Sequence, residues 1–152
     1  MTNPLITIDV TLTPHKGKSS RYQFRYTSTS GLVATDGRID LSNFPHDDVD
    51  IEFRLLPMAT GQPAFPAKSE DAIWFTKWPK HLPPPVPCPK SAGHSGSPFH
   101  QFSHPAANRL RFTNKNKDNK RYSYALRCIV VPGKPEVVDD PVIINKIGSS
   151  SA

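Results

Sequence analysis

Four residues of types that bind metal ions lie in the segment 81–105. Cys88, His94, His100 and His104 follow one another at spacings of six, six and four residues. A thiolate with imidazoles suits zinc or copper, and a blue-copper centre takes two His and one Cys on a β-sandwich. The spacing matches no established motif, and a Cys between two prolines lies in a rigid stretch. We therefore favour solvated surface side chains here and keep a metal site as the alternative.

A proline-rich stretch among aromatic residues offers a different chemistry, the recognition of a partner. Residues 82–87 read LPPPVP, which contains the P-x-x-P pattern of segments that dock in aromatic grooves. Long loops need internal packing, so we expect a structural loop over 79–107 whose prolines lie against neighbouring aromatics. If the chain binds a partner, the aromatic side chains expected to contact it are Trp74, Trp78, Phe99 and Phe102.

Neither the acidic residues nor the one serine–histidine segment supports catalysis. Asp50 and Glu52 alternate with apolar residues, so they fall on the polar face of a strand, where charge is expected. The segment GHSGS at 93–97 misses the G-x-S-x-G nucleophile elbow because position 97 is Ser. We expect no catalytic residue and no enzyme.

Alternating apolar and polar residues recur along the whole chain. Clear alternation occupies 5–12, 21–27, 49–55, 109–112 and 122–130, and weaker strands are expected at 38–42, 72–78 and 141–146. This period of two is typical of half-buried antiparallel strands, and turn-forming residues separate the runs. No helix of ten or more residues is expected.

Composition favours the same fold class. Proline accounts for 17 of 152 residues, about twice the usual share, and proline interrupts helices and interior strands alike. We predict one all-β domain over 1–147, an immunoglobulin-like antiparallel β-sandwich of about eight strands, with a disordered tail at 148–152. Two cysteines, Cys88 and Cys128, leave open whether a disulfide forms.

The segment DNKRYSYALRC at 118–128 resembles the start of strand F in immunoglobulin-type domains. Tyr122 follows Asp118 by four residues, and Tyr124 stands where these domains often place a disulfide Cys. The resemblance implies that the Tyr122 ring packs inward while its hydroxyl bonds a backbone group upstream. It also implies that Trp74 packs between the two sheets. Position 120 is Lys rather than a small residue, and the inter-sheet cysteine pair is missing.

The last third of the chain resembles the end of the DP-EP family of uncharacterised bacterial proteins. The matching residues are Tyr122, Tyr124, Asp140, Pro141, Ile143, Ile144 and Asn145. The resemblance implies an immunoglobulin-like sandwich without an established activity. Asp140-Pro141 suits the opening of a strand, since proline fixes φ and lacks an N–H.

Basic residues are concentrated in the segment 108–127. It carries Arg109, Arg111, Lys115, Lys117, Lys120, Arg121 and Arg127 against the single acid Asp118. As one hairpin this segment would present a basic edge that attracts anionic ligands or nucleic acid. Lysines at an edge also prevent sheets from associating, and we favour that interpretation.

Taken together, the sequence predicts a non-catalytic binding or interaction module. Its partner is expected to be a protein or a second copy of the chain. Nucleic acid and membranes are not expected, and neither is a cofactor unless the Cys/His segment binds a metal ion. The alternatives are a cupredoxin-like metal-binding module and a module that binds anions through 108–127. The chain has no secretory leader pattern at its start, so a cytoplasmic location is expected.

Overall fold

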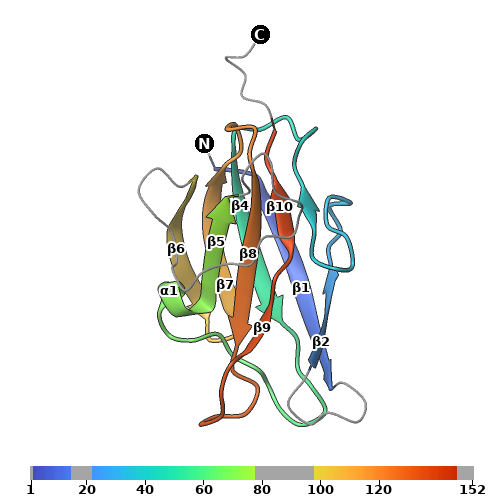
Figure 1. The fold of residues 1–152 in the computed structure, drawn as a ribbon, viewed down its shortest axis with the longest axis vertical. Coiled ribbons are helices and arrows are strands. Elements are labelled where there is room, and N and C mark those ends of the chain that lie inside the picture. The colour runs from blue at the N-terminus through green and yellow to red at the C-terminus, as the bar shows by residue number, and fades with distance from the viewer. Residues whose placement is uncertain (1, 15–21, 78–97, 147–152) are drawn as a thin grey trace.

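The chain folds into two β-sheets that lie one over the other (Figure 1). The computed structural model describes residues 2–14, 22–77 and 98–146. Within them the strands are β1 (Leu5–Pro14), β2 (Tyr22–Thr27), β3 (Ile39–Asp40), β4 (Asp48–Leu55), β5 (Ile73–Lys77), β6 (Phe99–Ala106), β7 (Arg109–Lys115), β8 (Arg121–Cys128), β9 (Val137–Asp139) and β10 (Val142–Ile144). A single helical turn, α1 (Ser69–Ala72), precedes β5.

The first sheet has the strand order β2-β1-β4-β7-β6, and the second has the order β3-β10-β8-β5 with β9 beside β8. Both sheets are mixed, because β1 pairs with β4 in parallel and β10 pairs with β3 in parallel. The all-β fold is confirmed, whereas the expectation of purely antiparallel sheets is wrong. Alternation specifies which face a side chain takes but not the direction of the neighbouring strand.

Inward-facing side chains of both sheets meet in one core. The predicted inward residues of β1, Ile6, Ile8, Val10 and Leu12, are at most 4% exposed. Aromatic rings connect the layers: Phe53 of β4 lies 5.5 Å from Tyr124 of β8, and Phe99 of β6 meets Tyr122 edge-on at 4.9 Å. Such pairs contribute about 0.5–1.5 kcal/mol beyond the burial of their area.

The structure corrects the expectation of a loop over 79–107, because Phe99–Ala106 forms the edge strand β6. Its register against β7 shifts twice, between His100 and Ser103 and again before Ala106. Gln101 has φ +57, in the left-handed region, within the first irregularity. These bulges interrupt the alternation by which a strand is recognised, and an edge strand tolerates Pro105. Residues 78–97 lie outside the described part.

The segment 108–127 is not one hairpin, which is a second correction. β7 pairs with β4 and β6 in the first sheet, while β8 pairs with β5, β9 and β10 in the second. The turn between them carries the chain from one sheet to the other. Arg109 and Arg111 therefore lie inside a five-stranded sheet rather than on a basic edge.

No helix in the described residues is long and apolar enough to cross a membrane.

Candidate functional site

The structure places two of the four predicted metal ligands on β6. The Nδ1 atom of His100 lies 3.3 Å from the carbonyl oxygen of Pro98, and Nε2 of His104 lies 3.4 Å from the Ser69 hydroxyl. Cys88 and His94 are outside the described residues. Across 2–14, 22–77 and 98–146, no three His, Cys, Asp or Glu side chains are grouped as a metal site would need. The metal site therefore stays a prediction.

The predicted partner-binding aromatics do not form an exposed surface where they are described. Phe99 is 4% exposed and stacks on Phe75 at 3.7 Å between ring centroids. Phe102 is half-buried and stacks on Phe112 at 5.6 Å. Both rings therefore serve the packing of the core. Trp78 lies outside the described part of the chain.

Trp74 does not pack between the sheets, contrary to the expectation. Its neighbours Ile73 and Phe75 face the core, so alternation turns Trp74 to the outer face of the second sheet. The guanidinium of Arg127 lies 3.9 Å from the centroid of its ring, and Trp74 is 7% exposed. A cation over an indole ring is favourable, so Arg127 helps to hold the ring against the sheet.

Asp118 and Tyr122 interact, but not in the predicted way. The Tyr122 hydroxyl donates to the carboxylate of Asp118 at 2.6 Å rather than to a backbone group. Asp118 also accepts hydrogen bonds from the backbone N–H of Lys120 at 3.0 Å and from the amide of Asn145 at 3.1 Å. The bond to a backbone carbonyl comes from the next inward tyrosine, Tyr124, which donates to Gly37 at 2.5 Å.

Pro141 lies directly before β10, the place that the Asp140-Pro141 pair predicts. It is buried, and its carbonyl accepts the backbone N–H of Tyr124 at 2.9 Å. The proline thus fixes the entry of β10 beside β8, as expected of a structural residue.

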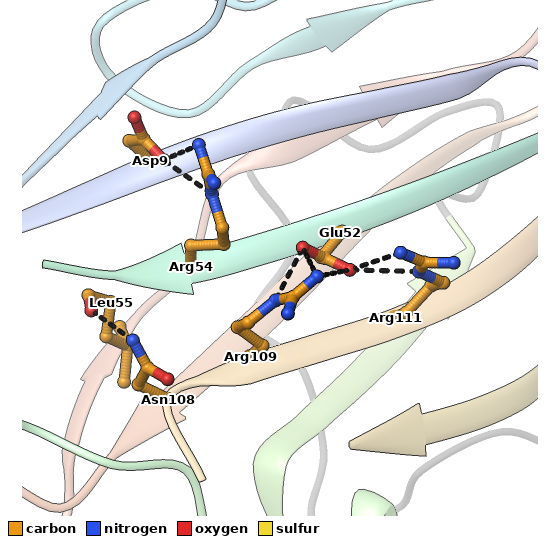
Figure 2. A network of polar contacts seen from close by, with 7 residues as sticks. All are labelled: Asp9, Glu52, Arg54, Leu55, Asn108, Arg109 and Arg111. Carbon is orange, nitrogen blue, oxygen red and sulfur yellow. Dashed lines mark hydrogen bonds and ion pairs between the residues drawn. The ribbon is translucent and has the colours of Figure 1, made fainter. Parts of the chain in front are cut away.

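A network of charged side chains lies on the outer face of the first sheet (Figure 2). We call it the arginine face: Asp9 from β1, Glu52 and Arg54 from β4, and Arg109 and Arg111 from β7. Register brings the residues together, because Asp9 is paired with Arg54, Arg54 with Arg109, and Glu52 with Arg111. The sequence places each of them on the polar face of its strand but does not reveal that β4 lies between β1 and β7.

Glu52 is the centre of the arginine face. It is 2% exposed and lies between two guanidinium groups, each of which contacts it through two nitrogen atoms. Arg109 donates to it from Nε at 2.9 Å and from Nη2 at 3.1 Å, and Arg111 does so from Nε at 2.9 Å and Nη2 at 2.8 Å. Burial alone would raise the pKa of the Glu52 carboxyl, but hydrogen bonds and charge from the two arginines outweigh it and lower that pKa. Glu52 is therefore ionised at neutral pH.

The five residues of the arginine face carry three positive and two negative charges, and Asp50 follows beside them on β4. Arg54 and Arg109 stand directly opposite each other, an arrangement that normally destabilises a sheet. The two guanidiniums are bound by different carboxylates, since Arg54 contacts Asp9 at 2.9 Å. Three cations thus share two anions, and each arginine side chain is 37–44% exposed. Nη1 of Arg109 and Nη1 of Arg111 donate to no residue in the described part, which leaves N–H groups for a ligand.

A second group of titratable residues is buried where β2 meets β9. The Tyr26 hydroxyl donates to Asp139 at 2.8 Å, which connects the first sheet to the second. Burial raises the pKa of Asp139, and the charges of Asp140 and Asp36 add to it, so the bond from Tyr26 does not restore the ordinary value. Cys128 is a buried thiol bonded to no other cysteine of the described residues, and burial raises its pKa, which disfavours the thiolate form.

We expect Asp139→Asn to raise the free energy of unfolding at neutral pH. A raised pKa means that the fold holds the Asp139 proton more tightly than the unfolded chain does. Stability from this group is therefore lost as the pH rises from about 3.9 through the raised value. Asn carries no charge and still accepts the hydrogen bond from Tyr26. The gain in the free energy of unfolding should therefore disappear near pH 4, at about the ordinary pKa of an Asp side chain.

Urea denaturation of both proteins across this pH range measures the difference. Glu52 has a lowered pKa and therefore stabilises the fold at higher pH, the opposite trend. Because both proteins contain Glu52, its contribution cancels in the difference between their free energies of unfolding. A variant that is less stable than the parent protein at neutral pH would show that an ionised Asp139 with its tyrosine bond is the preferred state.

A scan of the chain against protein-family models gave no match, and a search of curated proteins gave no significant match either.

Proposed function

We propose that this chain is a non-catalytic binding module whose arginine face contacts the acidic side chains of a protein partner. The observation that carries the proposal is the pair of guanidiniums fixed on Glu52. A guanidinium held by one carboxylate has lost its rotamer freedom before a ligand arrives, and its remaining N–H groups keep a fixed direction. This preorganisation favours bidentate contact with a second carboxylate.

The charges of this face favour a protein over nucleic acid. Asp9 and Asp50 lie beside the arginines and would repel a continuous row of phosphates. A protein surface with separate carboxylates can meet the arginines and avoid these acids. None of the five side chains of the arginine face is aromatic, so it offers no platform on which bases could stack.

The finer identity of the fold belongs to the same proposal. The Asp118–Tyr122 pair and the Asp140-Pro141 strand opening support an immunoglobulin-like sandwich and membership of the DP-EP family. Immunoglobulin-like sandwiches commonly serve as binding modules, which is an argument by analogy. The arginine face is the surface on which we propose that this module binds its partner.

Fluorescence polarisation with a labelled glutamate decapeptide tests the proposed function. We expect Arg111→Gln and Arg111→Lys both to weaken binding about tenfold, because Lys keeps the charge and loses the two-pronged contact. The charge-matched control Lys134→Gln lies between β8 and β9 and should change the affinity by less than about twofold.

Two results would overturn the proposal. One is equal binding by all three variants. The other is tighter binding of a single-stranded oligonucleotide than of the glutamate peptide at physiological salt. Thermal unfolding of each variant checks that the fold is kept.

A further inference from the structure

A small hairpin before β4 carries a surface pocket with two unlike charges. The backbone N–H of Ala34 bonds the carbonyl of Arg38 at 2.8 Å, and that of Asp40 bonds the carbonyl of Leu32 at 3.0 Å. Ile39 between them is fully buried. Because side chains alternate along an extended segment, Arg38 and Asp40 both point away from the core.

The pocket has a volume of about 310 Å³, at the small end of the range for ligand sites. Its apolar lining comes from Leu32, Val33 and Ala34, and its polar lining from Arg38, Asp40 and Asn43. A Cβ built on Gly31, at the same pocket, would meet no atom within 4 Å, which agrees with open space there. The lining thus combines a small apolar wall with polar and charged groups, which can fix the orientation of a ligand.

Both charged side chains of the pocket have atoms that can make further hydrogen bonds. Asp40 uses one oxygen to accept the backbone N–H of Ser42 at 3.0 Å and its hydroxyl at 2.6 Å. These bonds, together with the positive charges of Arg38 and Arg121, lower the pKa of Asp40, so it is ionised at neutral pH. No residue in the described ranges donates to its other oxygen. The Arg38 side chain is exposed, and its charge acts on Asp40 without a hydrogen bond or ion pair between them in the described ranges.

We propose that this pocket binds a small zwitterion of the α-amino-acid class with an apolar side chain. The carboxylate would meet Arg38, the ammonium would meet Asp40, and the side chain would lie on Leu32 and Ala34. A simple anion is repelled by Asp40 and a simple cation by Arg38. A molecule with both charges a few bonds apart satisfies both groups. The site is independent of the arginine face.

The test is a titration of the whole chain with L-leucine, followed by backbone amide NMR. We expect saturable shifts at Leu32, Ala34, Arg38 and Asp40 in the millimolar range. N-acetyl-leucine lacks the ammonium and leucinamide lacks the carboxylate, so each should bind about tenfold more weakly. Arg38→Gln and Asp40→Asn should each weaken leucine binding by a similar factor. Asn at 40 can still accept from Ser42, so the local turn is kept.

Absence of saturable shifts with leucine would overturn the proposal. It would also be overturned if either single-charge analogue bound as well as leucine, or if both variants kept the affinity. Arg111→Gln serves as the control, because it should leave leucine binding unchanged whether or not the arginine face binds a partner.

Discussion

Gly37→Ala is expected to lower the free energy of unfolding by about 3 kcal/mol or more. Gly37 has φ +94, a conformation that residues with a Cβ rarely adopt. An added Cβ would lie 2.7 Å from Cγ of Pro141 and 2.8 Å from Cε1 of Tyr26. Carbon atoms that are not bonded do not approach so closely, so the backbone or both neighbours must shift.

Neither neighbour of Gly37 can move easily. Pro141 is a rigid ring directly before β10, and Tyr26 is fully buried with its hydroxyl on Asp139. The carbonyl of Gly37 also accepts the Tyr124 hydroxyl. A shift of the Gly37 backbone would therefore weaken a bond to the second sheet while pressing on a tyrosine of the first.

Gly31→Ala is the matched control for this prediction. Gly31 also has a positive φ, +75, but an added Cβ there meets nothing within 4 Å. Its substitution should cost only the backbone strain, about 1 kcal/mol. Unfolding of both variants in guanidinium chloride separates the backbone strain from the effect of the close approach of Pro141 and Tyr26. Equal losses would show that the close approach of Pro141 and Tyr26 contributes nothing.

The inward faces of the strands could be predicted because they depend on local alternation alone. Each inward residue expected in β1 is buried, and so are Tyr122 and Tyr124 of β8. The spacing of four residues brings Asp118 and Tyr122 together as expected, but the predicted backbone acceptor was wrong, because the Tyr122 hydroxyl donates to the Asp118 carboxylate. In both cases the physical cause acts within a few residues of chain.

The partners across the sheets could not be predicted, because they depend on the order of the strands. Arg109 and Arg111 follow Glu52 by 57 and 59 residues, and no local pattern joins them. Alternation likewise does not predict that β7 and β8 belong to different sheets. Strand β6 was missed for the opposite reason, since its bulges remove the local pattern itself.

The second large effect is expected from Asp118→Ala, about 2–4 kcal/mol of lost stability. The Asp118 carboxylate accepts from the Tyr122 hydroxyl, the Lys120 backbone and the Asn145 side chain. Tyr122 and Asn145 are 3% and 2% exposed, so water cannot readily replace the lost acceptor. Donors left unpaired inside a protein cost more than the hydrogen bond contributes.

The loss should spread beyond Asp118 because Asn145 connects the two sheets. Its amide exchanges hydrogen bonds with Asn114 of β7, at 2.8 Å in one direction and 3.2 Å in the other. Asn145 lies directly after β10, so this pair joins the ends of β7 and β10. Without the Asp118 carboxylate, the Asn145 amide loses one of its two described acceptors.

Tyr122→Phe and Asp36→Ala separate the contributions to this effect. Tyr122→Phe removes one donor and leaves Asp118 its other two, so a loss of about 1 kcal/mol is expected. Asp36 accepts the backbone N–H of Arg38 at 3.0 Å, the same local bond that Asp118 makes with Lys120, but none of the described side chains donates to it. Asp36→Ala should therefore change stability by less than about 0.5 kcal/mol. If Asp118→Ala costs no more than Asp36→Ala in urea denaturation, Asp118 is only a turn residue and does not support the contact of Asn145 with Asn114.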